Sequence, residues 1–226
     1  LYGFAWPTRD IPVIMEKSSD YARNAVLNAT RIWNLAQIWF STTYGVTSRP
    51  YRFVEVEQPG QSYVNMTFNQ TQTRDDWGYT WWHYSNDSRG VFYKITISIS
   101  LDLTLRDGRS LTFLEIQALA AHELGHALGL NHTVFSETDL MNHFSPGHRI
   151  AIPSTLNLYA LALLSMADSR NDMPKSPVAL PQGIPYGTPP ESAVPEIPFP
   201  LITLTLTLGI AITIIKYRKT RNKSLG

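Results

Sequence analysis

The sequence contains no cysteine and only six histidines among its 226 residues. Without cysteine the chain has no disulfide bonds, no thiolate nucleophile and no zinc site with sulfur ligands, so a metal site must use histidine, aspartate or glutamate. The net charge is +1, and five of the nineteen basic residues lie in the last eleven positions, which leaves the preceding part mildly acidic. This distribution argues against nucleic acid as a partner.

Charge is also absent from residues 197–215, which have the sequence IPFPLITLTLTLGIAITII. Such a segment is long enough to cross a hydrocarbon core as a helix, and a basic cluster follows it at 216–226. We therefore expect a single-pass protein of the cell membrane, with a transmembrane helix at 197–215, a basic cytoplasmic tail at 216–226 and the N-terminal part outside. The alternation of leucine and threonine at 201–208 leaves a strand of a soluble domain as the alternative.

Proline is concentrated just before this apolar segment, since residues 174–200 hold nine of the fifteen prolines. This composition favours an extended polyproline II conformation and predicts a stalk at 174–196 between the membrane and a domain at 1–173. The sequence VPEIPFP, the apolar run and KYRK together also resemble the carboxyl-terminal sorting signals of archaeal and bacterial surface proteins, but permanent anchoring is the favoured interpretation.

Residues 1–173 show a strand, a long helix, several strands and two further helices, a pattern that predicts an α/β (α+β) domain. A strand at 11–15 precedes an amphipathic helix of about twenty residues that is capped within residues 18–20. A last helix is expected to begin after Ser154. The other expected strands are 51–57, 63–69, a shorter one at 79–83, and 91–101.

Three of the six histidines lie within eleven residues, in the sequence AAHELGHALGLNH at 120–132. Thr112 and Glu115 predict a capping box at the start of the helix that carries this sequence. His122 and His126 are four residues apart and therefore lie on one face of the helix, where two imidazoles can bind one metal ion. The spacing thus indicates a metal site rather than a chance cluster.

Three further features of this sequence point to catalysis. Glu123 is displaced from the histidine face by one residue, where its carboxylate can reach a metal-bound water without binding the metal. Gly129 can adopt a positive φ, which ends the helix and lets His132 return to the same ion. Three neutral imidazoles leave one tetrahedral position open, as in catalytic zinc sites. The residues predict hydrolysis of peptide bonds by metal-activated water, with Glu123 as the general base.

The motif HELGHALGLNH, followed by Met141 in DLMNHF, resembles the metzincin metalloproteases, whose signature is HExxHxxGxxH and a methionine turn. Thr133, directly after the third histidine, is most similar to the corresponding residue of the matrixin family. The resemblance implies a zinc metalloendopeptidase of zincin fold, with a mixed twisted sheet, a long backing helix, an active-site helix and a C-terminal helix. It implies that Met141 forms an apolar floor under the zinc ligands, which are His122, His126 and His132.

Two groups of residues are candidates for the substrate pocket. The first follows the methionine turn and consists of Asn142, His143 and Phe144; His143 stands where some metzincins carry a tyrosine that assists at the metal. The second is the aromatic stretch WGYTWWHY at 77–84, which includes Trp81 and Trp82. The resemblance places such a strand at the upper rim of the cleft, where it would pair with an extended polypeptide substrate. Core packing or a partner surface explains the aromatic residues equally well.

Two alternatives to this function stay open. The first is a zinc-binding but non-catalytic cell-surface module, for adhesion or envelope assembly, although the intact Glu123 argues against it. The second is another class of zinc enzyme with Glu137 as the third ligand, which would leave Gly129 and His132 unexplained.

A structural calcium ion is a further expectation with little support, because no ligand spacing matches a calcium motif. The acidic residues considered for it are Asp75, Asp76, Asp102 and Asp107.

Overall fold

The computed structural model describes residues 1–194, except for residues 3, 47, 71–76, 144–150 and 168–171. The predicted transmembrane helix at 197–215 and the predicted tail at 216–226 lie outside the described residues. Within the described part of the chain, no helix is both long and apolar enough to cross a membrane.

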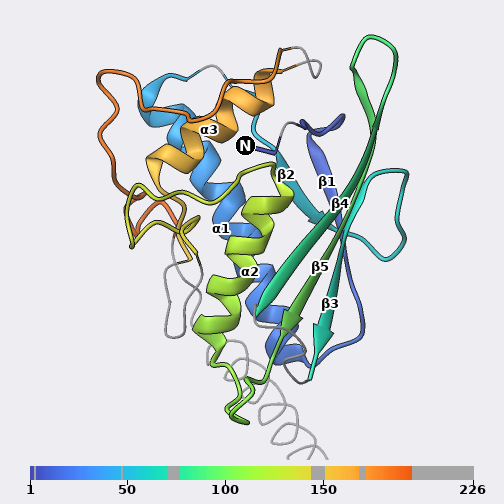
Figure 1. Ribbon diagram of the computed structural model, residues 1–226. Coiled ribbons are helices and arrows are strands. Elements are labelled where there is room, and N and C mark those ends of the chain that lie inside the picture. The colour runs from blue at the N-terminus through green and yellow to red at the C-terminus, as the bar shows by residue number, and fades with distance from the viewer. Residues whose placement is uncertain (3, 47, 71–76, 144–150, 168–171, 195–226) are drawn as a thin grey trace, which may run out of the picture. The chain divides into compact units, whose positions relative to one another are not determined.

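Five strands form a single mixed sheet with the order β2-β1-β3-β5-β4 (Figure 1). The strands are β1 (Asp10–Met15), β2 (Arg52–Glu55), β3 (Tyr63–Asn69), β4 (Gly78–Asn86) and β5 (Phe92–Asp102). The pairings β1–β2, β1–β3 and β3–β5 are parallel, whereas β4 pairs antiparallel with β5. The expected mixed sheet is thus confirmed, and β4 lies at one end of the strand order.

In the described part of the chain, three helices accompany the sheet: α1 (Asp20–Tyr44), α2 (Phe113–Ala127) and α3 (Thr155–Met166). Figure 1 shows α1 and α2 on the same face of the sheet, and α2 contacts both β4 and β5. The indole Nε1 of Trp33 in α1 donates a hydrogen bond of 2.8 Å to the carbonyl oxygen of Ala121 in α2. Helix α1 therefore supports α2 directly behind the histidine sequence.

The alternating residues of β5 decide which face of the sheet meets the helices. Ile95, Ile97 and Ile99 are fully buried, while Lys94 and Ser98 are exposed. Strand β4 is longer than the expected 79–83, because it pairs with β5 from residue 78 to residue 86, with an irregularity at its end. This long pairing fixes the register of β4 against β5 and therefore the position of β4 relative to α2.

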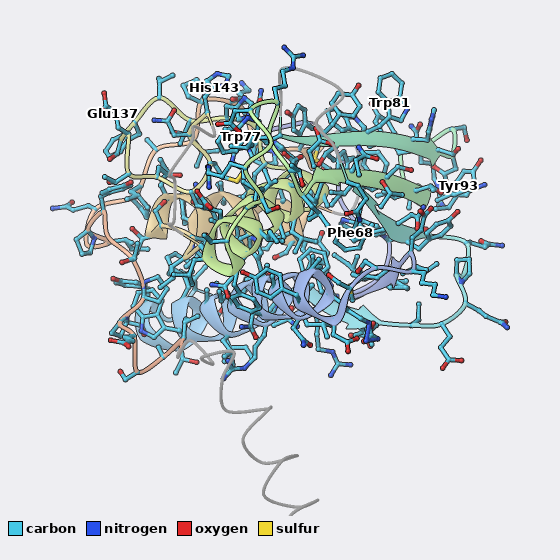
Figure 2. The ribbon with its side chains drawn as sticks, turned by 90° about the horizontal axis from the view of Figure 1, so that it is seen from below. Phe68, Trp77, Trp81, Tyr93, Glu137 and His143 are labelled. Atoms are coloured by element: carbon cyan, nitrogen blue, oxygen red, sulfur yellow. The ribbon has the colours of Figure 1, made fainter. Side chains whose placement is uncertain are left out.

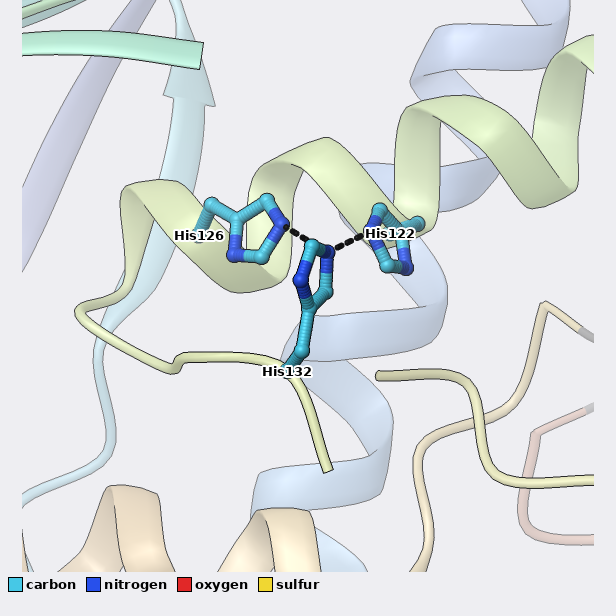
Figure 3. Close-up of side chains that lie close together, drawn as sticks. All are labelled: His122, His126 and His132. Carbon is cyan, nitrogen blue, oxygen red and sulfur yellow. Dashed lines mark hydrogen bonds between the residues drawn. The ribbon is translucent and has the colours of Figure 1, made fainter. Parts of the chain in front are cut away.

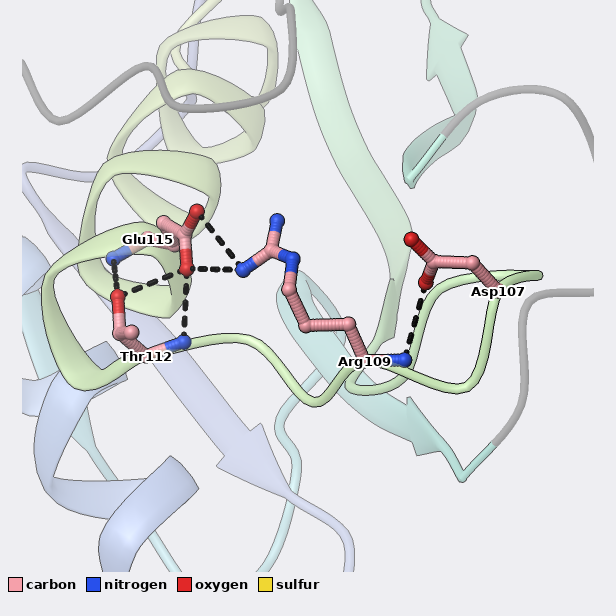
Figure 4. Close-up of polar contacts among 4 residues, drawn as sticks. All are labelled: Asp107, Arg109, Thr112 and Glu115. Carbon is pink, nitrogen blue, oxygen red and sulfur yellow. Dashed lines mark hydrogen bonds and ion pairs between the residues drawn. The ribbon is translucent and has the colours of Figure 1, made fainter.

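The start of α2 is fixed by the predicted capping box, which the structure confirms (Figure 4). The Thr112 hydroxyl accepts a hydrogen bond from the Glu115 backbone N–H, and the Glu115 carboxylate accepts one of 2.9 Å from the Thr112 N–H. Arg109 adds an ion pair of 3.0 Å with Glu115. Burial alone would raise the pKa of Glu115, but the hydrogen bonds from Arg109 and Thr112 lower it to about 2.

Glu115→Gln is expected to lower the free energy of unfolding at pH 7 by roughly 1–2 kcal/mol, because the amide cannot replace the charged acceptor. The carboxylate stabilises the fold above its unfolded pKa of about 4.5, and this contribution is lost as the pH falls toward the folded pKa of about 2. Urea unfolding should therefore give a difference between parent and variant that shrinks between pH 5 and pH 2. The exposed Asp107→Asn change is the control, and a difference that stays constant with pH would contradict the account.

Residues 184–194 of the predicted stalk contact the domain. The Tyr186 hydroxyl donates a hydrogen bond of 3.0 Å to Asp139, and the Gly187 carbonyl accepts one of 2.7 Å from the Thr155 N–H at the start of α3. Val194 is fully buried in the core. The described residues up to 194 thus form one compact unit, and a stalk in front of a membrane stays a prediction.

These contacts predict that a protein ending at residue 173 is less stable than one ending at residue 194. The shorter protein loses an acceptor for the first N–H of α3, the Tyr186–Asp139 hydrogen bond and the burial of Val194. We expect a loss of roughly 2–4 kcal/mol in the free energy of unfolding, measured by urea unfolding of the two proteins. Equal stabilities would show that residues 174–194 do not belong to the folded unit.

Candidate metal centre

The two histidines of α2 and the turn that follows them bring three imidazole rings together (Figure 3). Gly129 has φ of 94°, its N–H bonds the His126 carbonyl at 2.9 Å, and the Leu130 N–H bonds the Gly125 carbonyl at 3.0 Å. This pair of bonds is the Schellman arrangement that ends a helix and reverses the chain. His132 thereby returns toward α2, and its ring lies between those of His122 and His126.

The distances between the three rings suit a single metal ion. The Nε2 atom of His132 lies 3.2 Å from Nε2 of His122 and 3.1 Å from Nε2 of His126. In a tetrahedral zinc site with bonds of about 2.0–2.1 Å, two ligand nitrogens lie about 3.3 Å apart. Among the residues that the structure describes, these histidines are the group of three or more potential ligands that could hold a metal ion.

Backbone carbonyls fix the orientation and the tautomer of two of these rings. Nδ1 of His122 lies 2.7 Å from the Leu140 carbonyl oxygen, and Nδ1 of His126 lies 2.9 Å from the Leu130 carbonyl oxygen. A carbonyl oxygen only accepts hydrogen bonds, so both Nδ1 atoms carry the proton and both Nε2 atoms present a lone pair. One proton on His132 could satisfy only one of these lone pairs, whereas a cation satisfies all three nitrogens. The residues therefore fit a bound metal ion.

The burial of the site differs from one histidine to the next. His122 and His126 are buried, whereas His132 is exposed. Burial, which is the largest cause, and the neighbouring His132 and His143 lower the pKa of His126 to about 4, against the raising effect of the hydrogen bond to the Leu130 carbonyl. His126 therefore stays neutral at pH 7, which is the form that binds metals. The site is open to solvent on the side of His132.

Glu123, which follows His122 in α2, is buried and contacts β4. Its carboxylate accepts a hydrogen bond of 2.5 Å from the Thr80 hydroxyl. A Cβ atom added at Gly78 would lie 2.5 Å from Oε1 of Glu123, so the strand backbone passes directly against the carboxylate. Neither Gly78 nor Thr80 is predicted from the sequence as a neighbour of Glu123. A glycine inside a strand is a signal of close backbone approach, but it does not identify what approaches.

Met141 lies against the centre of α2. A Cβ atom at Gly125 would overlap the Met141 sulfur, so this methionine packs directly on the helix between His122 and His126. The buried Asp139 accepts a hydrogen bond of 2.8 Å from the Met141 N–H, and the Met141 carbonyl accepts one of 2.8 Å from Thr133. The turn is therefore tied both to α3, through Asp139 and Ser154, and to the residue after His132.

The residues after Met141 lie at different distances from the histidines. The His143 ring is exposed, and its centroid lies 4.1 Å from that of His132. Asn142 is half-buried and donates a hydrogen bond of 3.0 Å to the Ser136 carbonyl. Phe144 lies outside the described residues. Glu137 is exposed and is not part of the group that could hold a metal ion.

The two tryptophans of β4 lie on opposite faces of the strand, because successive side chains alternate. Trp82 is half-buried and its ring centroid lies 4.1 Å from that of Tyr2. Trp81 is 52% exposed and projects from the sheet on the side away from α2 (Figure 2). The structure therefore brings Trp82 toward the metal centre and does not bring Trp81 there.

Tyr2 is another neighbour of the site that the sequence analysis missed. Its ring centroid lies 5.5 Å from that of His126, and its backbone N–H bonds the Gly129 carbonyl at 2.9 Å. Burial and the negative charge of Glu123 raise the pKa of its hydroxyl. No sequence pattern links a residue at position 2 to a motif more than one hundred positions later.

The aspartates considered for calcium do not form a site in the described residues. Asp102 is buried and accepts a hydrogen bond of 2.7 Å from Asn69, while the Asp107 side chain accepts one of 3.0 Å from the Arg109 N–H. Asp75 and Asp76 lie outside the described residues.

The chain shows weak structural similarity to a solved protein structure. Neither family models nor curated proteins match this sequence. Among solved structures, the chain is similar to one titled "Crystal structure of myroilysin", with 18% sequence identity and a TM-score of 0.28. The similarity covers 74% of this chain and 60% of that chain, so this chain spans less than two thirds of the other's length.

Proposed function

We propose that this protein is a zinc-dependent endopeptidase. The observation that carries the proposal is the convergence of three imidazole Nε2 atoms, two of them in rings oriented by backbone carbonyls. The buried Glu123 directly follows His122 in the same helix. A site that only stabilises the fold needs four ligands and no acid or base, whereas a hydrolytic site needs an open position and a base.

The zinc ligands in this proposal are His122, His126 and His132. A bound zinc ion would act as a Lewis acid that activates water and polarises a substrate carbonyl. Glu123 accepts a proton from the attacking water while the water oxygen forms a bond to the carbonyl carbon of the substrate. It then donates this proton to the amide nitrogen as the C–N bond breaks, so that the products are a carboxylic acid and an amine. Met141 supports the two ligands of α2 from below.

The position of β4 supports an extended polypeptide as the substrate. This strand ends the order of the sheet and carries Thr80 and Gly78 against Glu123. A sheet edge offers backbone donors and acceptors to an extended peptide, which would add a strand beside β4. Such pairing would bring a scissile bond close to the general base. The half-buried Trp82 and the exposed His143 are the side chains proposed to line the pocket.

We propose that the enzyme acts outside the cell on extracytoplasmic proteins. The uncharged residues 197–215 and the basic residues after them support a single membrane anchor with the domain outside. Protease protection of intact cells tests this topology. An external protease should remove the domain and leave an epitope at the C-terminus protected, whereas protection of the domain would contradict it.

The experiment that tests the enzymatic proposal is cleavage of an unstructured protein, casein, by the zinc-loaded full chain. Cleavage should stop when the zinc is chelated and resume when zinc is restored. Fragments mapped by mass spectrometry should arise from internal bonds, since an endopeptidase needs no chain terminus. A protein that binds one zinc ion but cleaves neither casein nor a broad peptide library would instead support the non-catalytic module.

A further inference from the structure

The Thr80 hydroxyl connects the proposed general base to the sheet. The Thr80 hydroxyl lies 2.5 Å from Oε2 of Glu123 and 3.3 Å from the Glu123 carbonyl oxygen. Both residues are buried, with exposed fractions of 8% for Thr80 and 4% for Glu123. A charge-assisted bond of this kind is shorter and stronger than one between neutral groups. The hydroxyl therefore connects β4 to the side chain and the backbone of α2 at the same residue.

Gly78 shapes the other side of the same carboxylate. An added Cβ atom there would lie 2.5 Å from Oε1 and 2.8 Å from Cγ of Glu123, and 2.8 Å from Cδ1 of Leu119. One carboxylate oxygen thus rests against the strand backbone while the other accepts the hydrogen bond from Thr80. Any side chain at position 78 would displace Glu123 from this position.

The rest of β4 makes this arrangement rigid. Thr80 pairs with Ile99 and Gly78 pairs with Leu101 in the antiparallel ladder, and both partners are fully buried. The register of β4 is therefore set by the core of the domain, and the hydroxyl has a fixed position relative to α2. Valine at position 80 would have nearly the same volume as threonine but no hydroxyl. Because a buried hydroxyl is costly without a partner, we attribute the role of the Thr80 hydroxyl to its hydrogen bonds with Glu123.

We propose that Thr80 is a positioning residue for the general base and that Gly78 provides the space in which Glu123 is held. This inference rests on the proposed peptidase function. A glutamate side chain has several rotamers, and proton transfer requires one of them, with the carboxylate within hydrogen-bond reach of the reacting water. Thr80 selects that rotamer from the sheet side, so its loss lowers the rate of the chemical step more than it weakens substrate binding.

The test compares Thr80→Val with Thr80→Ser in the zinc-loaded full chain. The valine variant should lower kcat about 10-fold or more while KM changes less than about 3-fold, and the serine variant, which keeps the hydroxyl, should stay within about 3-fold of the parent. In a Glu123→Gln background, Thr80→Val should add no further loss, because the group that Thr80 positions is already absent. Equal losses with valine in both backgrounds would overturn the proposal.

Crystal structures of the variants supply a second result that does not depend on turnover. Glu123 should leave its position or become disordered in Thr80→Val and stay in place in Thr80→Ser. Gly78→Ala should displace the carboxylate while Thr80 is intact, and it serves as the independent variant if Thr80→Val does not fold. Zinc content and the thermal midpoint identify variants that lost the site or the fold.

These results separate the two proposals. If the parent cleaves no peptide, the peptidase proposal fails, but the position of Glu123 in the crystal structures still decides whether Thr80 holds it. If the parent cleaves peptides, and the Thr80→Val variant keeps both the parental position of Glu123 and the parental kcat, the positioning role is wrong and the peptidase proposal stands.

Discussion

Glu123→Gln is expected to bind one zinc ion as the parent does and to cleave peptides with kcat/KM reduced by about 10²–10⁴-fold. The amide has nearly the same shape as the carboxylate and can still occupy the space beside Gly78 and Thr80. It cannot accept the proton of the attacking water, however. Initial rates on an internally quenched peptide, measured together with zinc content, test this expectation.

Glu137→Gln is the matched control for this variant. Glu137 is exposed and is not part of the group that could hold a metal ion. The cleavage activity of Glu137→Gln should therefore equal that of the parent. Two results would contradict the role of Glu123: parent-like cleavage by Glu123→Gln, or loss of activity that is accompanied by loss of zinc. The second result would make Glu123 a ligand or a structural residue rather than a base.

His126→Ala is expected to weaken zinc binding by at least about 100-fold, because a buried, neutral ligand is lost from a site with three. In the parent, zinc at 100 to 1,000 times its dissociation constant should raise the free energy of unfolding by about 3–4 kcal/mol, since it binds only the folded site. The variant should lose most of this increase. Isothermal titration with zinc and urea unfolding with and without zinc measure the two effects.

His83→Ala is the matched control for the ligand variant. His83 is exposed on β4, where its Nε2 accepts a hydrogen bond of 2.8 Å from the Trp81 indole. The His83→Ala variant should bind zinc with the same affinity as the parent. Retention of full zinc affinity by His126→Ala would show that the three imidazoles do not form the site.

The part of the site that lies within one stretch of sequence could be predicted from local rules. Helical periodicity places His122 and His126 on one face, and a glycine after a helix predicts the reversal that returns His132. The capping box of α2 follows from Thr112 and Glu115 in the same way, because its hydrogen bonds join residues three positions apart. These features depend on backbone geometry over one or two helical turns.

The partners of Glu123 could not be predicted, because they come from another element of the fold. Thr80 and Gly78 reach the carboxylate only through the pairing of β4 with β5 and the packing of α2 against both strands. The aromatic stretch around them predicts a single rim of the cleft, whereas the alternation of side chains along the strand places Trp81 and Trp82 on opposite faces. Periodicity gives two faces but does not decide which face meets the helix.

The proline-rich segment shows the same difference between local and long-range information. The proline-rich composition favours an extended conformation, but it does not indicate that Tyr186 donates a hydrogen bond to the buried Asp139. That bond joins residues 47 positions apart and depends on where α3 begins. Proline content alone therefore does not show which residues of this segment contact the domain, and the boundary at residue 173 stays a prediction.

The most direct test of the central claim is a crystal structure of the zinc-loaded protein with diffraction data collected on both sides of the zinc absorption edge. The account predicts one anomalous peak about 2.0–2.1 Å from Nε2 of His122, His126 and His132, with the fourth position open to a water molecule or a ligand. A peak at another place, a fourth protein ligand such as Glu137, or the absence of a peak at one molar equivalent of zinc would contradict it.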